Sequence, residues 1–159
     1  LEPTITLTTT SNYLSFSEFI QRELQSIGLD IKIEVIPPSA LKSAKSNGKV
    51  DLFRASWVAD YPDAQNYLSL FYSKNFAPNG PNYTHFKDDQ FDTWYTQALL
   101  ETDPENRIEL YKKMDARVME KAPIVVLFYD EVVRFIGTDV KGLGINPTNL
   151  LELKNVWKN

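Results

Sequence analysis

Cysteine is absent from the 159 residues of the chain, and histidine occurs only once, at His85. A chain without cysteine forms no disulfide and performs no thiolate chemistry. One histidine provides neither a histidine metal cluster nor more than one member of a catalytic triad. The carboxylates do not follow the spacing of a calcium loop, and no glycine-rich loop joins a strand to a helix. We therefore predict no metal, no cofactor and no nucleophilic catalysis.

An excess of positive charge is also absent. The chain has 17 Lys and Arg against 21 Asp and Glu, and no run of basic residues. Nucleic acids and anionic membranes bind to basic surfaces, so neither is an expected partner. The longest apolar runs, such as residues 122–129, are far shorter than the roughly 20 residues of a membrane span. The opening LEPTITLTTT is unlike a signal peptide, so we expect an internal segment of a longer protein.

The composition that is present is typical of a globular domain, with 43% hydrophobic and 24% charged residues. In the first third of the chain, β-branched or alternating segments are separated by segments of helical periodicity. We predict strands over 4–10, 30–36 and 50–57, with helices over 15–27 and 39–47. This order predicts an α/β fold with a mixed sheet flanked by helices.

Two kinds of capping signal mark the starts of helices. Ser15 and Glu18 have the spacing of a capping box. Asp103 and Pro104 suit the N-cap and the first position of a long helix. A further amphipathic helix is predicted over 88–101.

The rest of the second half is predicted as loops and strands. Residues 72–87 are rich in Pro, Gly and Asn, which is typical of a loop. Two apolar strands are predicted over 124–129 and 132–136, and we expect the first of them to join the main sheet. The tail, residues 140–159, is interrupted by Gly and Pro and contains no strong element.

The segment RASWVADYPDA, residues 54–64, places opposite charges and a large aromatic side chain at the end of a predicted strand. Open α/β sheets present ligand sites at the carboxyl ends of their strands. Arg54 has a guanidinium fork that suits a carboxylate, and Asp60 offers an acceptor for an ammonium group. Together the two charges suit a zwitterion.

Each of these charges also has an ordinary structural explanation. Arg54 can pair with a neighbouring acid, Asp60 can form an Asx-turn, and Asp63 can cap a helix that begins near Tyr67. Two other functions stay open. One is a hydrolase with Asp60 and Asp63 as its acidic pair. The other is an interaction module with an exposed apolar face, in which Trp57 packs into the core.

Four segments together resemble a known family, the family 5 extracellular solute-binding proteins, which are oligopeptide and dipeptide receptors of ABC importers. They are RASWVADYPDA at 54–64, FDTWYTQALLETDPENRIELYKKMDARVMEKAPIVVLFY at 91–129, VKGLGINP at 140–147 and IQRELQSIGLDIKIEV at 20–35. Each motif alone is modest, but their order and spacing extend the resemblance over nearly the whole chain.

The resemblance implies a class II periplasmic-binding-protein-like fold, in which two α/β lobes close on a ligand. Residues 1–159 would form a single lobe, the second, with the N-terminal lobe absent. The function implied is peptide binding for uptake by an ABC importer, with the permease subunits as partners. The location implied is periplasmic or extracytoplasmic, either soluble or membrane-anchored.

The resemblance also implies which residues bind the ligand: Arg54, Trp57, Asp60 and Tyr61. In peptide-binding members, an Asp at the position of Asp60 pairs with the amino terminus of the peptide. In the oligopeptide branch, an Arg at the position of Arg54 holds its carboxylate, and Trp57 matches a tryptophan that lines the site. Other members of this fold bind sugars, nickel chelates or opines, so a non-peptide solute is the alternative.

Overall fold

The first half of the protein is a small α/β unit. The computed structural model describes residues 4–146 and 148–159. The unit contains β1 (Ile5–Thr9), α1 (Leu14–Ser26), β2 (Ile31–Val35), α2 (Pro38–Ser46) and β3 (Leu52–Phe53). The three strands form a parallel sheet in the order β2-β1-β3. This confirms the predicted α/β fold.

The turn from β1 into α1 differs from the predicted capping box. A short 3₁₀ turn, η1 (Ser11–Tyr13), follows the strand, and α1 begins at Leu14 with Tyr13 as an N-cap that makes no side-chain bond. Ser15 is therefore already inside the helix, so the predicted role for Ser15 and Glu18 is wrong. The hydroxyl that fixes this turn is that of buried Ser17. It lies 3.0 Å from the Thr9 hydroxyl and donates to the Tyr13 carbonyl at 2.9 Å.

The second half of the core is helical. It contains α3 (Gln65–Leu68), η2 (Ser69–Phe71), η3 (Ser73–Asn75), α4 (Asp89–Leu100) and α5 (Pro104–Lys121). Helices α4 and α5 pack on each other, and α3 packs on α5. Their shared core consists of Leu68, Phe71, Phe91, Tyr95, Ala98, Met114 and Val118. Asp103 accepts hydrogen bonds from the first backbone N–H groups of α5, which confirms the predicted N-cap.

The predicted loop over 72–87 is confirmed, and one buried side chain organises it. Asn82 is fully buried and donates to the carbonyls of Tyr72 and Phe86 at 3.1 and 3.0 Å. His85 lies in the same loop, where its Nε2 is 3.1 Å from the carbonyl of Ala77. The single histidine therefore has the ordinary hydrogen-bonding role that a lone loop histidine usually has.

Three predicted strand assignments are wrong in extent or existence. The third strand ends at Phe53, so the segment from Arg54 to Trp57 lies outside the sheet. Residues 124–129 and 132–136 form no strand, although their composition favours one. A strand requires a neighbour for its backbone hydrogen bonds, and these residues have none within the described parts of the chain.

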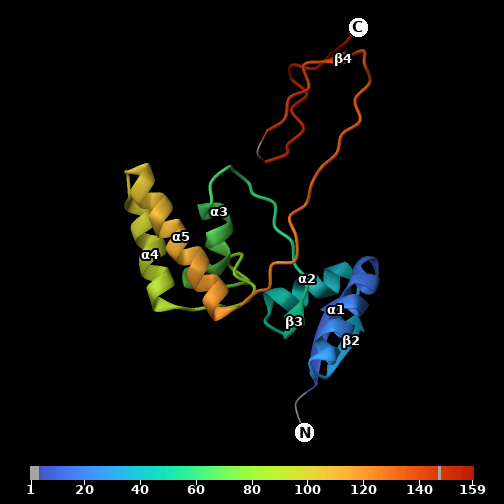
Figure 1. The fold of residues 1–159 in the computed structure, drawn as a ribbon, viewed down its shortest axis with the longest axis vertical. Coiled ribbons are helices and arrows are strands. Elements are labelled where there is room, and N and C mark those ends of the chain that lie inside the picture. Colours follow the sequence, from blue (N-terminus) through green and yellow to red (C-terminus); the bar gives the residue numbers. More distant parts are fainter. Residues whose placement is uncertain (1–3, 147) are drawn as a thin grey trace.

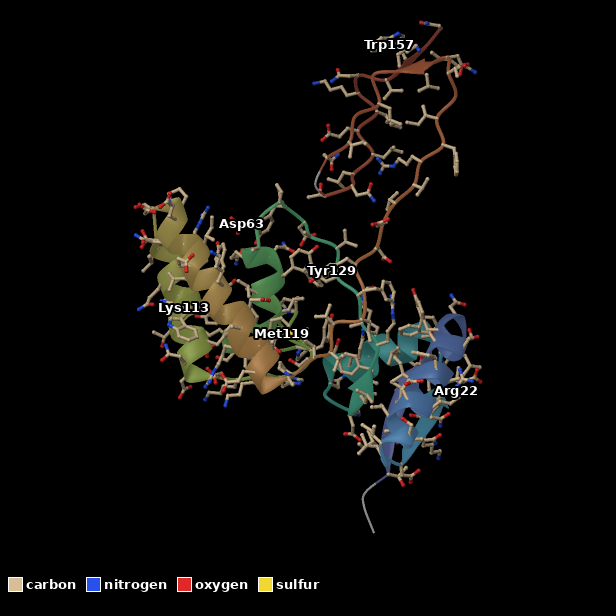
Figure 2. The ribbon with its side chains drawn as sticks, viewed as in Figure 1. Arg22, Asp63, Lys113, Met119, Tyr129 and Trp157 are labelled. Carbon is tan, nitrogen blue, oxygen red and sulfur yellow. The ribbon has the colours of Figure 1, made fainter. Side chains whose placement is uncertain are left out.

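The residues after α5 leave the two units (Figure 1). Their first part reaches α1, where Phe128 meets Phe16 edge to face with ring centroids 6.0 Å apart. The tail then forms a two-stranded antiparallel pair, β4 (Val140–Lys141) with β5 (Trp157–Lys158). Many apolar side chains of this region are exposed, including Phe135 at 98%. Figure 2 shows Tyr129 on this segment, 87% exposed.

Candidate ligand-binding site

The carboxyl ends of β1 and β3 lie at one edge of the sheet, which we call the crevice because open α/β folds bind ligands at this position. Thr8 is paired with Phe53, so both strands end at the same edge, and the residues that follow them leave the sheet beside each other. From the central strand β1 the chain proceeds through α1 to β2 on one side, whereas β3 lies on the other side. The strand order therefore reverses between β1 and β3. Ligands of open α/β sheets bind outside the carboxyl ends of the strands at such a point.

Arg54 lies at this crevice. Its guanidinium carbon is 3.8 Å from the centre of the Tyr13 ring, and Tyr13 ends η1, the 3₁₀ turn that follows β1. This cation–π contact fixes the side chain without neutralising it. Among the described residues, Arg54 forms no ion pair. The neighbouring acid that the structural explanation required is therefore not found within them.

A second cation, Lys45, adds to the positive charge near Arg54, and we call these two residues the positive corner. The ammonium group of Lys45, on α2, lies 5.4 Å from the Phe53 ring centre and 5.2 Å from that of Tyr83. Burial lowers the pKa of Lys45, and the charge of Arg54 lowers that pKa further. Two unneutralised cations that disfavour each other are stabilised when an anion binds between them. The corner is suited to a carboxylate or another anionic group.

Trp57 and Asp60 meet at a third residue, Asn66. The indole N–H of Trp57 donates to Oδ1 of Asn66 at 2.6 Å. The Nδ2 of Asn66 lies 3.5 Å from Oδ2 of Asp60, a long contact that leaves most of the acceptor capacity of the carboxylate free. Asn66 is 3% exposed, whereas Asp60 is open to solvent.

Tyr61 is connected to the helical unit in a similar way. Gln65 forms short hydrogen bonds with the hydroxyls of both Tyr61 and Tyr95. Tyr95 is buried and stacks on Tyr72 with ring centroids 4.4 Å apart. Burial raises the pKa of Tyr95, which keeps its hydroxyl protonated. Tyr61 remains 43% exposed beside Asp60.

Asp63 has a structural role at the start of α3, although the N-cap of this helix is Ala64 and not Asp63 as predicted. Its Oδ1 accepts from the backbone N–H of Gln65, the first residue of α3, at 2.9 Å. Its other oxygen pairs with Arg107 of α5 at 3.7 Å. Burial and the Asp63 carboxylate raise the pKa of Tyr111 to about 12. Asp60 and Asp63 thus have separate partners, so the geometry does not favour the acidic-pair hydrolase.

The structure brings three of the four predicted site residues together. Trp57, Asp60 and Tyr61 gather at the start of α3, through Asn66 and Gln65, while Arg54 lies at the β1 side of the crevice. Sequence reasoning missed the supporting residues Tyr13, Lys45, Gln65 and Asn66. Of these, only Asn66 had a recognisable signal, since a polar amide in the apolar run after Asp63 suggests a buried hydrogen bond.

Two other features are absent from the described residues. No group of three His, Asp or Glu side chains is placed to hold a metal ion. No helix among these residues is long and apolar enough to cross a membrane.

An α/β unit with a crevice at a strand-order reversal is the architecture of a ligand-binding fold, and the comparisons identify which one. The model of the bacterial extracellular solute-binding proteins, family 5, matches residues 2–79. The chain belongs to this family.

Individual relatives support the assignment. The dipeptide-binding protein DppE of Bacillus subtilis is 27% identical over 99% of this chain and 29% of its own length. The murein tripeptide-binding protein MppA of Escherichia coli has the same fold, with a TM-score of 0.82, 24% identity, and coverage of 98% of this chain and 30% of that one. The binding protein DppA of Helicobacter pylori, solved with the peptide STSA, is 32% identical over 76% of this chain and 24% of its own, with a TM-score of 0.70. The chain thus spans less than a third of each.

Proposed function

We propose that this chain forms part of the substrate-binding component of an ABC importer and that the component binds peptides. The observation that supports the proposal is a pair of unlike charges, Arg54 and Asp60, on the segment that follows β3, neither of which has an ion-pair partner among the described residues. Arg54 is held by an aromatic ring and forms no ion pair within the described residues, and Asp60 makes only one long contact. A peptide has one charge of each sign at its ends, so it complements this arrangement. The relatives named for dipeptides and tripeptides support the same ligand class.

In this proposal the four predicted residues have distinct roles. Asp60 accepts from the terminal ammonium group of the peptide, and Arg54 binds its carboxylate through a charge-assisted bidentate contact. Trp57 and Tyr61 provide apolar area with a polar group at the tip, which suits contact with a peptide backbone and variable side chains.

The remaining parts of the proposal concern the whole protein. Because the chain spans less than a third of its relatives, we propose that it is one lobe and that an N-terminal lobe completes the cleft. The loaded protein would act outside the cytoplasm and deliver its peptide to the permease subunits of the importer. The 125–136 segment, with its many exposed apolar side chains, would then pack against the rest of the protein.

The test uses the complete protein and three forms of one probe: trialanine, N-acetyl-trialanine and trialanine amide. We expect calorimetry to give the highest affinity for the free peptide, and acetylation or amidation each to weaken it about 10- to 100-fold. Equal affinity for the free and acetylated peptides would refute the peptide assignment. Tight binding of a neutral solute at the same crevice would favour the non-peptide alternative.

A further inference from the structure

Asn66 connects two of the proposed ligand contacts and is itself almost fully buried, at 3% exposure. We propose that Asn66 is the positioning residue of the site: it holds Trp57 and Asp60 in place so that Asp60 distinguishes a free amino terminus from a blocked one. This inference rests on the proposed function, because it concerns how the same site recognises a peptide.

The hydrogen-bonding groups of Trp57, Asn66 and Asp60 allow only one arrangement, in which Asn66 accepts from Trp57 and donates to Asp60. An indole N–H is a donor only, and an ionised carboxylate is an acceptor only. A side chain that bonds to both must present one acceptor and one donor, and the asparagine amide does so. Its oxygen takes the indole N–H of Trp57 at 2.6 Å, which leaves its NH₂ group turned toward Asp60 at 3.5 Å.

The segment that carries Trp57 and Asp60 needs such support. Within the described residues, the backbone of residues 57–60 forms no hydrogen bond with other backbone groups, since the sheet ends at Phe53. Side chains must therefore determine where these residues lie. Asn66 contacts both the Trp57 indole and the Asp60 carboxylate, so one residue determines the position of both.

Asn66 itself is well anchored. Its backbone N–H donates to the carbonyl of Asp63 at 3.0 Å, and its own carbonyl accepts from the Ser69 hydroxyl at 2.7 Å. Two residues further along α3, Leu68 is part of the helical core. The amide is thus fixed to the rigid part of the fold, and a site on a rigid element is held more accurately than one on a loop.

The length of the contact with Asp60 has a functional consequence. At 3.5 Å the amide orients the carboxylate but satisfies little of its capacity to accept hydrogen bonds. An arriving ammonium group then finds an oriented acceptor that needs little rearrangement. Without the amide, Asp60 would be free to turn into solvent, and the ammonium contact would have to order it again.

The experiment substitutes Asn66 in the complete protein and measures the ratio of affinities for trialanine and N-acetyl-trialanine. Asn66→Leu keeps the size of the side chain and removes both hydrogen bonds. The matched control is Asn82→Leu, because Asn82 is also a buried asparagine with backbone partners but lies in the 72–87 loop. We expect the ratio to fall from about 10–100 to about 3 or less in Asn66→Leu, and to stay unchanged in the Asn82 control.

A spectroscopic readout reports the Trp57 contact directly. The indole N–H signal of Trp57, identified by its loss in Trp57→Phe, should exchange with solvent at least about tenfold faster in Asn66→Leu. Asn66→Asp is the second variant. It retains the acceptor for Trp57, so the indole signal should stay protected. It also places a second carboxylate near Asp60, which should make the ratio pH-dependent between about pH 4 and 7.

The outcomes separate this inference from the proposed function. A wild-type protein that binds both peptides equally refutes the proposed function itself. A wild-type preference that persists in Asn66→Leu, with unchanged indole exchange, overturns the positioning role and leaves the function standing. If Asn66→Leu does not fold, Asn66→Asp decides: a ratio equal to wild type at every pH overturns the inference, and the pH-dependent ratio supports it.

Discussion

Removal of the Arg54 charge gives the sharpest test of whether Arg54 binds the carboxylate of a ligand. The guanidinium is stacked 3.8 Å from the Tyr13 ring centre and has no acidic partner among the described residues. Its charge is therefore available to pair with an anionic group of a ligand. A hydrogen bond to a charged group contributes about 1.5–3 kcal/mol. Arg54→Gln should therefore weaken the binding of trialanine about 10- to 150-fold.

The chemistry of the two cations predicts an intermediate result for Arg54→Lys. Lysine keeps the positive charge but lacks the planar fork and its stacking on an aromatic ring. We expect its loss of affinity to lie between those of wild type and Arg54→Gln. Arg22→Gln is the matched control, because Arg22 lies on the exposed side of α1 (Figure 2) and its loss changes the net charge equally.

The assay is a thermodynamic cycle by calorimetry in the complete protein, with trialanine and trialanine amide as ligands. The affinity difference between them should be large in wild type and in the Arg22→Gln control, and should nearly vanish in Arg54→Gln. A difference that is the same in wild type and in Arg54→Gln would show that Arg54 does not contact the ligand carboxylate. The proposed binding of the peptide carboxylate by Arg54 would then be refuted.

Three further predictions concern stability. Arg117 donates twice to Asp88, the N-cap of α4, and this hydrogen bonding lowers the pKa of Asp88. Its stabilisation should be present above about pH 4 and lost as the pH falls through the lowered pKa, so Asp88→Asn should flatten the acid limb of urea-unfolding stability against pH. Tyr111, with a pKa of about 12 against about 10 when unfolded, should stabilise fully below pH 10 and lose that contribution as the pH rises toward 12; Tyr111→Phe should remove this alkaline loss in the same assay. Met114 is fully buried, so Met114→Ala should lower the free energy of unfolding by about 2–5 kcal/mol. Met119 is 52% exposed on the same helix (Figure 2), so Met119→Ala should change the free energy of unfolding, measured by chemical denaturation, by less than about 0.5 kcal/mol.

The sequence predicted correctly those elements that depend on residues close together in the chain. Asp103 and Pro104 start α5 because capping depends on neighbouring residues. The strand at 124–129 was predicted from composition, but a strand also needs a partner, and propensity does not supply one. The same reason applies to β3: the apolar pattern continues to Trp57, yet only Leu52 and Phe53 pair with β1.

The candidate site shows the same division. Arg54, Asp60 and Trp57 were predicted because unlike charges and an aromatic residue are unusual after a strand. Their supporting residues were not: Tyr13 is far in sequence from Arg54, and Asn66, although near in sequence, meets Trp57 and Asp60 only because the chain bends between them.

The early end of β3 is what allows the site to form. In a continuing strand, Trp57 and Asp60 would lie about 10 Å apart and point to opposite faces of the sheet. One asparagine amide could not reach both. Because the chain leaves the sheet after Phe53 and bends from Asp60 onward, the indole and the carboxylate converge on Asn66. The backbone hydrogen bonds that this segment forgoes are replaced by solvent and by side-chain contacts, which explains why polar and aromatic residues are concentrated in it.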